Sequence, residues 1–309
     1  MSDIAAILLP LNGASTDTAA LTLSLHLARR FGAHLQALHI GTDSREVAPL
    51  AGEGLSGAMV EEMMTAAERE AGRRLVDVRV QFETALALDA EANGGNRMAT
   101  SEAMPARISG SGPSSEPTAK REPSISFRAR IGREHELVAH AARLSDLIVV
   151  PHPDADEAIS SSEALHAVLF DSGRPVIIAP KQAPRTIGRR ICIAWNGTAE
   201  SASAVLSALD WLSAAEAVQI LYSDDYQRRG PGAAELVGYL AGHGIAASTA
   251  GFRPVGGEVG AGLLAAAEAF GSDLLAMGAY SHSRLRQLIM GGVTRHVIGR
   301  ARLPVLMAR

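Results

Sequence analysis

The C-terminal stretch Gly271-Ser-Asp-Leu-Leu-Ala-Met-Gly278, followed after a polar loop by Gly291-Gly-Val-Thr-Arg-His-Val and then by Leu303-Pro-Val-Leu-Met-Ala308, decides the fold. Its run 273–277 is apolar after Asp273 and too short for a helix, which is typical of a buried parallel strand. The spacing by four of Val293, Val297 and Ala301 predicts a helix that begins after Gly291-Gly292, and residues 304–307 predict another strand. A strand, a loop and a helix N-terminus in this order bring free backbone N–H groups and the positive end of a helix dipole together, which favours an anion.

The same unit occurs earlier in the chain. Leu144-Ser-Asp-Leu-Ile-Val-Val-Pro151 corresponds to 271–278, and residues 174–180 correspond to the last strand. Asn12-Gly13 and Asn196-Gly197 each follow a strand-like run, at an offset of 184 residues, whereas Asp146 and Asp273 are 127 residues apart. The first copy therefore carries 57 additional residues between these points. Two copies in which strands alternate with helices predict an α/β fold of two doubly wound, five-stranded parallel sheets.

Two segments account for the additional residues. Residues 55–90 predict one long amphipathic helix, with Gly72 as its weakest point, and an apolar stripe on one face that we expect to pack in the core. The stripe consists of Met59, Met63, Ala67, Ala71, Leu75, Val78, Phe82 and Leu86. Residues 93–123 are rich in Gly, Pro and Ser, which predicts a disordered insert or surface loop.

Gly278, Ser281, Gly291 and Gly292 resemble the Gly-x2-Gly-x9-Gly-Ser/Thr motif of the universal stress protein family. Two of the four positions fit, since Ser281 stands at a Gly position and Gly292 at a hydroxyl position. The resemblance implies two Rossmann-like domains of the adenine nucleotide alpha hydrolase type, at 1–180 and 189–309. It also implies that the last strands of the two copies, 176–179 and 305–308, pair antiparallel, so that the chain forms an internal pseudo-dimer.

The ligand crevice of such a sheet lies at the carboxyl ends of its strands, where the strand order reverses. In the second copy this edge holds the end of the first strand, the end of the fourth strand and the helix that follows. The resemblance implies that an adenine nucleotide, ATP with Mg²⁺, binds there, with its phosphates at the helix N-terminus. The candidate binding residues are Ala194, Asn196, Gly197, Met277, Gly278, Ser281, His282, Arg284, Gly291, Gly292, Val293 and Thr294.

Some residues at this edge leave other interpretations open. Asn12 and Asn196 stand where nucleotide-binding relatives carry Asp, which would alter contacts with the base, but the interpretation we favour for each is a plain Asn-Gly turn. Trp195 could stack on a ring or pack in an interface. Pro151-His-Pro153 in the first copy removes backbone donors, so we expect that half to be structural or an interaction surface.

Three functions therefore remain open: a stress-response protein that senses a nucleotide, a scaffold that binds other proteins or itself through its edge strands, and a slow ATPase. Hydrolysis needs a metal-binding carboxylate and a group that positions water, and no such pair stands out, so we expect no turnover. The scattered histidines match no closed set of metal ligands.

Composition and charge exclude further classes of partner and location. The formal net charge is −4 and the pI about 6.2, so nothing attracts the chain as a whole to nucleic acid or anionic lipid. The single cysteine, Cys192, lies in an apolar run and excludes a disulfide within the chain. No apolar run approaches ~18 residues, and the N-terminus lacks a basic signal region, so we expect a cytoplasmic protein without a membrane segment.

Overall fold

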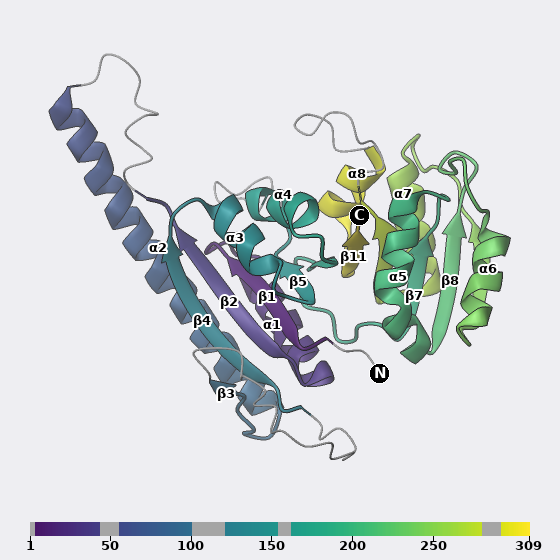
Figure 1. The fold of residues 1–309 in the computed structure, drawn as a ribbon, viewed down its shortest axis with the longest axis horizontal. Coiled ribbons are helices and arrows are strands. Elements are labelled where there is room, and N and C mark those ends of the chain that lie inside the picture. Colours follow the sequence, from purple (N-terminus) through teal and green to yellow (C-terminus); the bar gives the residue numbers. More distant parts are fainter. Residues whose placement is uncertain (1–3, 44–55, 101–120, 154–161, 280–291) are drawn as a thin grey trace, which may run out of the picture.

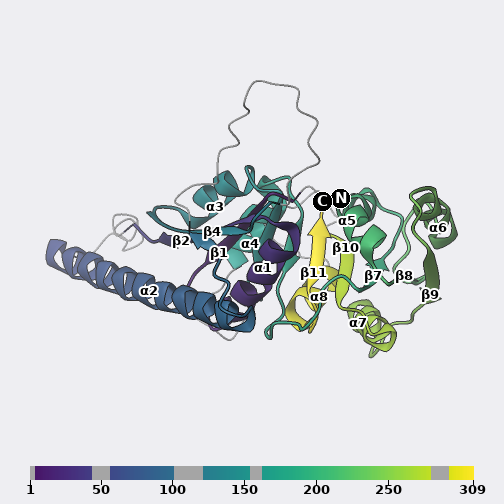
Figure 2. The same ribbon diagram turned by 90° about the horizontal axis from the view of Figure 1, so that it is seen from below.

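The computed structural model describes residues 4–43, 56–100, 121–153, 162–279 and 292–309. These residues form an α/β fold around one mixed parallel and antiparallel sheet. Its eleven strands have the order β3-β4-β2-β1-β5-β6-β11-β10-β7-β8-β9 (Figure 1). Helices cover both faces of the sheet, and its two halves lie side by side along its length (Figure 2). Among these residues, no helix is both long and apolar enough to cross a membrane.

The N-terminal half holds β1 to β6. Its strands are β1 (Ala6–Leu11), β2 (His34–Gly41), β3 (Ala99–Thr100), β4 (Ser124–Ile131), β5 (Leu147–Val150) and β6 (Val176–Ile178). Its helices are α1 (Asp17–Phe31), α2 (Gly57–Ala92), α3 (Glu134–Ala142) and α4 (Ser162–Asp171).

The C-terminal half repeats this arrangement in a shorter chain. Its strands are β7 (Arg190–Ala194), β8 (Ala217–Tyr222), β9 (Ala247–Gly251), β10 (Leu274–Gly278) and β11 (Val305–Ala308). Its helices are α5 (Ala199–Ala214), α6 (Ala233–Gly242), α7 (Val259–Phe270) and α8 (Gly292–Arg300). Apart from the short strand β3, the two halves have the same strand order, β4-β2-β1-β5-β6 and β9-β8-β7-β10-β11, and all neighbours within a half are parallel.

The two halves meet at β6 and β11, which pair antiparallel with Ile177 opposite Leu306. The predicted antiparallel pairing of the last strands is therefore present. It also joins the two predicted sheets into one continuous sheet, because each of these strands would otherwise be an open edge.

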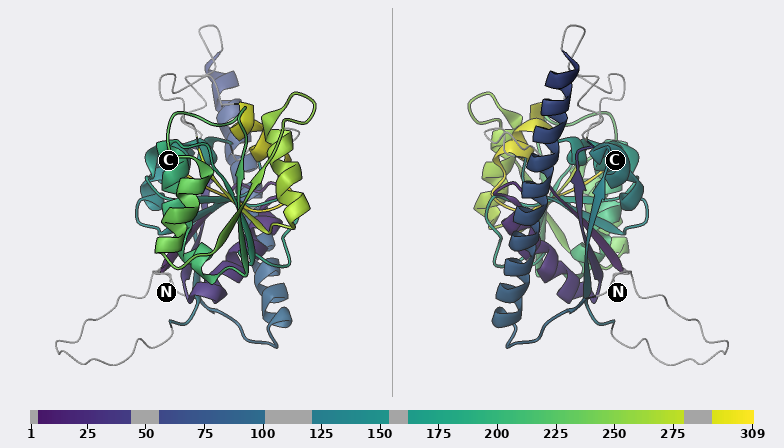
Figure 3. Two further views of the ribbon diagram at one scale, coloured as in Figure 1. Left: turned by 90° about the vertical axis from the view of Figure 1, so that its right-hand side faces the viewer. Right: turned by 90° about the vertical axis from the view of Figure 1, so that its left-hand side faces the viewer.

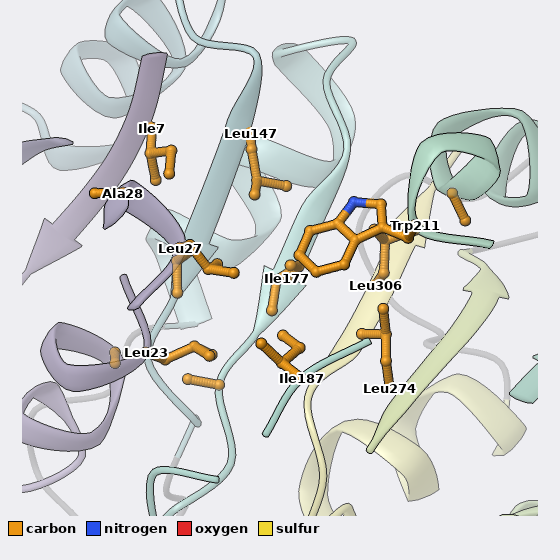
Figure 4. Close-up of a cluster of buried hydrophobic side chains, with 14 of the residues drawn as sticks. Ile7, Leu23, Leu27, Ala28, Leu147, Ile177, Ile187, Trp211, Leu274 and Leu306 are labelled. Carbon is orange, nitrogen blue, oxygen red and sulfur yellow. The ribbon is translucent and has the colours of Figure 1, made fainter. Parts of the chain in front are cut away.

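One apolar core runs across this joint. Ile177, Leu306, Leu27 and Trp211 are all buried in the same cluster on one face of the sheet (Figure 4). Leu27 and Trp211 occupy corresponding positions of α1 and α5. Ile187, in the connection between β6 and β7, lies between the halves in the same cluster. A second buried cluster covers the other face and also contains residues of both halves.

Aromatic and cationic contacts reinforce the joint. The Phe31 and Trp211 rings meet edge to face at 5.1 Å, and the Arg30 guanidinium lies 4.8 Å from the Trp211 ring centroid. Arg30 also donates a hydrogen bond to the carbonyl of Ile187. Its pKa is lowered by burial, partly offset by Asp273. The contacts bind α1, the connection and α5 together.

The long helix differs from its prediction in what it buries. It is continuous from Gly57 to Ala92 and passes Gly72 without a break, but Met59 and Met63 are 50% and 39% exposed, so their prediction as core residues is wrong. A 36-residue helix is about 54 Å long, whereas the eight-residue strand β4 spans only about 27 Å. The helix therefore extends beyond the sheet, and its buried residues, such as Val78 and Phe82, lie in its second half (Figure 3).

Candidate functional site

The end of β7 is a tight turn built by Asn196. Its side-chain oxygen accepts hydrogen bonds from the backbone N–H of Thr198, at 3.2 Å, and from the Thr198 hydroxyl, at 2.9 Å. The Thr198 Oγ1 in turn accepts from the N–H of Ser201 and caps α5. Asn196 thus acts here as a turn residue, which supports the plainer of its two interpretations.

The same turn follows β1. The Asn12 side chain accepts from the N–H of Ala14 at 3.0 Å, and Asp17 accepts from the N–H groups of Asn12 and Gly13. The amino ends of the central strands also match: Asp146 accepts from the N–H of Ala5 and Ala6, and Asp273 from those of Arg189 and Arg190. The repeat read from the sequence is therefore a repeat of hydrogen bonds as well.

Gly278 ends β10 directly against the first turn of α5. A Cβ added at this position would lie 2.6 Å from the backbone carbon of Glu200 and 2.6 Å from the backbone nitrogen of Ser201. No real Cβ fits at that distance, so the glycine is required by the approach of the strand to the helix. The preceding Met277 and the neighbouring Ala194 are buried in the core below this edge.

Helix α8 begins at Gly292, beyond the carboxyl end of β10. Gly292 is exposed, and an added Cβ would meet no heavy atom within 4 Å. Val293 is half-buried and Thr294 is buried. The N–H groups of the first turn of a helix have no partner within the helix, so this end can accept an anion.

A second part of the edge is closed by the chain itself. After β8, residues 223–232 turn back over the end of β7, where the N–H of Arg228 donates to the carbonyl of Asn196 at 2.8 Å. Trp195 is buried, and its indole N–H donates to the carbonyl of Pro231 at 2.8 Å. Gly197 and Gly230 touch so closely that a Cβ on Gly230 would lie 2.0 Å from the Gly197 carbonyl oxygen. Trp195 is thus a packed residue and not an exposed stacking platform.

Two buried titratable groups of this half, Cys192 and Tyr226, are held in their uncharged forms by burial. Burial raises the pKa of the Cys192 thiol to about 11 and that of Tyr226 to about 12. Cys192 is buried in the middle of β7, so a reactive thiolate is not available at neutral pH. Among the described residues, no group of three or more His, Cys, Asp or Glu could hold a metal ion.

The N-terminal half fills the corresponding edge with side chains. Pro151 stands at the position of Gly278, and the Thr16 hydroxyl donates to the carbonyl of the buried His152 at 3.0 Å. Helix α2 packs over the turn after β1, since a Cβ on Gly13 would lie 3.2 Å from Arg74 Cγ. This edge is therefore occupied by the protein's own residues.

The predicted site is only partly brought together in the described residues. Ala194, Asn196, Gly197, Met277, Gly278, Val293 and Thr294 lie along the carboxyl edge of β7 and β10 and the start of α8, with Gly292. Ser281, His282, Arg284 and Gly291 lie outside the described residues. The strand ends and the helix start thus form one edge, and the loop that connects them is not described.

Comparison with known proteins identifies this half. Residues 188–309 match the model of the Universal stress protein family. The C-terminal half of this chain belongs to the universal stress protein family.

The whole chain has the fold of solved universal stress proteins. One from Archaeoglobus fulgidus DSM 4304 is 15% identical, with coverage of 100% of this chain and 99% of that one, and a TM-score of 0.64. The functionally unknown protein PA1789 from Pseudomonas aeruginosa PAO1 is 13% identical, with coverage of 99% and 92% and a TM-score of 0.52. At these identities the likeness concerns the fold alone. No curated protein sequence matches the chain.

Sequence reasoning missed one feature of this universal stress protein domain, the segment 223–232 that closes the corner between β7 and β8. Its signal was the run Gly230-Pro-Gly232, since such a run marks a turn. The sequence does not reveal that the turn folds back onto Trp195, because that contact joins residues 36 positions apart.

Proposed function

We propose that this chain is a tandem of two universal stress protein domains, residues 1–180 and 189–309, in which only the second binds a small anionic ligand. The ligand class is an adenine nucleotide, with ATP and Mg²⁺ as the first to test. The observation that carries the proposal is the exposed Gly292 in the first turn of α8, the helix that follows the strand end Gly278. Helix N-terminal N–H groups and glycine backbones are the features that cradle phosphate.

Such a domain acts by binding and not by turnover. In this proposal the first domain is a scaffold, since Pro151 and helix α2 fill its edge, and the second reports the presence of the ligand in a stress response. Phosphates would lie against the first turn of α8. Any Mg²⁺ would arrive with the nucleotide and be held in part by its phosphate oxygens.

The experiment compares Gly292→Glu with Gly299→Glu. Both glycines are exposed on α8, and both have open space where a Cβ would be added, so neither substitution disturbs packing. A carboxylate at position 292 lies at the phosphate end of the helix and repels the ligand, whereas one at position 299 lies about 10 Å away along the same helix.

Thermal unfolding with and without ATP·Mg²⁺ is the measurement. At a ligand concentration of 100 times Kd the wild type gains about 2.7 kcal/mol, or several degrees in Tm. Gly299→Glu should keep that gain and Gly292→Glu should lose it. Mass spectrometry of small molecules released from the denatured wild type identifies the natural ligand, and a phosphate-release assay on the same variants tests slow hydrolysis. Equal gains in both variants would refute the site.

A scaffold that binds no nucleotide is the second candidate function. It is favoured by the segment 223–232, which turns back over the end of β7 and keeps Trp195 buried, so this aromatic ring is not offered to a base. In that case the wild type gains no stability from any adenine nucleotide and releases none on denaturation.

A further inference from the structure

The two edge strands of the sheet are protected to different degrees against pairing with another chain. At one end, β3 covers the first residues of β4 by pairing with Ser124 and Ile125, and β4 continues with the charged residues Arg128 and Arg130. At the other end, β9 has the sequence Ala-Ser-Thr-Ala-Gly, without a charge or a proline, and no described strand pairs with its outer side. Proteins that remain monomeric commonly protect an edge with charges, prolines or a covering segment. The edge at β9 has none of these on its own strand.

The backbone groups that face outward on β9 can be assigned from its pairing with β8. The N–H of Phe252 donates to the carbonyl of Tyr222 at 2.9 Å, so residue 252 points inward, toward β8. In a parallel strand the two backbone groups of one residue point to the same side, and the side alternates along the strand. The N–H and C=O groups of Ala247, Thr249 and Gly251 therefore point away from the sheet.

We propose that β9 pairs with β9 of a second copy of this chain, antiparallel, about a two-fold axis at Thr249. In this register each Thr249 lies opposite its counterpart, and each Ala247 lies opposite the Gly251 of the other copy. All of these residues point their backbone groups outward, so the groups can exchange hydrogen bonds in both directions. An isologous contact of this kind closes on itself and yields a dimer and not a filament.

A second copy fits this edge for two reasons. Pairing β9 with itself brings no like charges together, since the next charged residue toward the C-terminus, Arg253, would lie across from Ile245. The two-fold axis is perpendicular to the sheet, so it also brings the two α6 helices to the same face. Helix α6 lies beside β9 at this end of the molecule, and its Tyr239 is 47% exposed (Figures 1 and 2). This aromatic side chain can add apolar area to the contact.

The mode of pairing is already used within the chain. The halves are joined by the antiparallel strands β6 and β11, with Val176, Ile177 and Ile178 in register with Met307, Leu306 and Val305. A β9 pair would extend the sheet by the same device at its far end. The inference goes beyond the proposed ligand binding, because the contact does not use the edge at α8.

The test is a charge swap at Thr249. This residue is exposed, and its outward backbone groups are not needed for pairing with β8, so Thr249→Lys and Thr249→Glu should both fold. In either homodimer two like charges face each other across the axis, which should weaken self-association by about tenfold or more. An equimolar mixture of the two variants should associate again, since it places Lys opposite Glu. Ala129→Lys, on the exposed part of β4 at the other end of the sheet, is the control and should associate like the wild type.

Sedimentation velocity of the full chain across the micromolar range measures the association, and far-UV circular dichroism checks the fold. Dimers of the wild type and of the control, loss of the dimer in each single variant and its recovery in the mixture establish the pairing. A wild type that is monomeric throughout, a Thr249→Lys dimer as tight as the wild type, or a mixture that fails to recover would each overturn it.

Discussion

The two halves of this chain have the same architecture and different carboxyl edges. In both, the strands follow the same order, an Asn side chain closes the turn after the central strand, and an Asp holds the amino end of that strand. At the end of the neighbouring strand, however, the N-terminal half has Pro151 and the C-terminal half has Gly278. The edge of the N-terminal half is filled by side chains and by α2. In the C-terminal half, Gly278 lies directly against the first turn of α5.

This difference shows which features of the fold are independent of ligand binding. Strand order, strand capping and the Asn turn are present in both halves, so they serve the architecture. Among the described residues, the glycine at the strand end is particular to the second half, where it lets α5 approach, and Pro151 stands at this position in the first, so this position is the one to compare when a ligand is tested. Substitutions at corresponding positions can therefore separate structural from functional roles.

The largest effect should come from the core that both halves share. Trp211→Ala should cost about 3–5 kcal/mol and Leu27→Ala about 2–5 kcal/mol, because both side chains are buried in the cluster across the joint. Since this one cluster contains residues of both halves, each variant should unfold in a single transition at lower urea. Urea unfolding of Leu27→Ala is followed by circular dichroism, which reports on the whole chain, and by fluorescence of Trp195 and Trp211, which reports on the C-terminal half. Two separate transitions would mean that the halves are independent domains.

The next effect separates the two glycines of the candidate site. Gly278→Ala should destabilise the protein by about 1–3 kcal/mol, because its Cβ would collide with the backbone of Glu200 and Ser201. Gly292→Ala should be neutral or stabilise by up to about 1 kcal/mol, since it adds a helix-forming residue where there is open space. Urea midpoints of the two variants measure this contrast. Equal losses would place Gly292 in a packed environment.

Much of the fold could be predicted from the sequence because its signals are local. Short apolar runs ended by Gly or Pro predicted the central strands, as at 273–277, where the strand is Leu274–Gly278. Thr198 was recognisable as a helix cap, and Asn196 as a turn residue, from their own chemistry and positions. The repeat was visible because the two copies keep the same residues at strand ends.

The features that could not be predicted depend on distant contacts. The periodicity of α2 shows which face is apolar, but not that the sheet ends before the helix does, so Met59 and Met63 were misassigned to the core. At the candidate site, Trp195 could be given two roles from the sequence, and only its hydrogen bond to Pro231 distinguishes them. Burial of His39 under α2 likewise depends on where the helix packs.

A moderate effect is expected where the two halves start their first helices differently. Thr198→Ala removes the hydroxyl that caps α5 and bonds to Asn196, which should cost about 1 kcal/mol. Helix α1 has no such side-chain cap at Thr16, and Asp17 holds the preceding N–H groups instead. Thr18→Ala, in the exposed first turn of α1, is the matched control and should leave the urea midpoint nearly unchanged. A loss in the control as large as that of Thr198→Ala would contradict the role of the cap.

The smallest effect should appear on mild acidification, and it should originate in the N-terminal half. His34 and His39 are buried there, and burial is the main cause that lowers the pKa of both. Arg128 lowers the pKa of His34 further, whereas for His39 the hydrogen bond to the Leu11 carbonyl partly offsets the lowering and Arg74 adds to it. A folded-state pKa below the ordinary value of about 6.5 means that the unfolded chain binds protons first as the pH falls. Stability should therefore be full above about pH 6.5 and should decline below it until the folded-state pKa values are reached.

The Nδ1 of His39 donates to the carbonyl of Leu11, so His39→Gln can keep a donor while it removes the titration. Urea midpoints at pH 7.5 and pH 6 should differ less in His39→Gln than in the wild type, and His243→Gln, on the exposed C-terminal surface, should behave like the wild type. An unchanged pH dependence in His39→Gln would show that this buried imidazole does not contribute to the acid sensitivity of the N-terminal half.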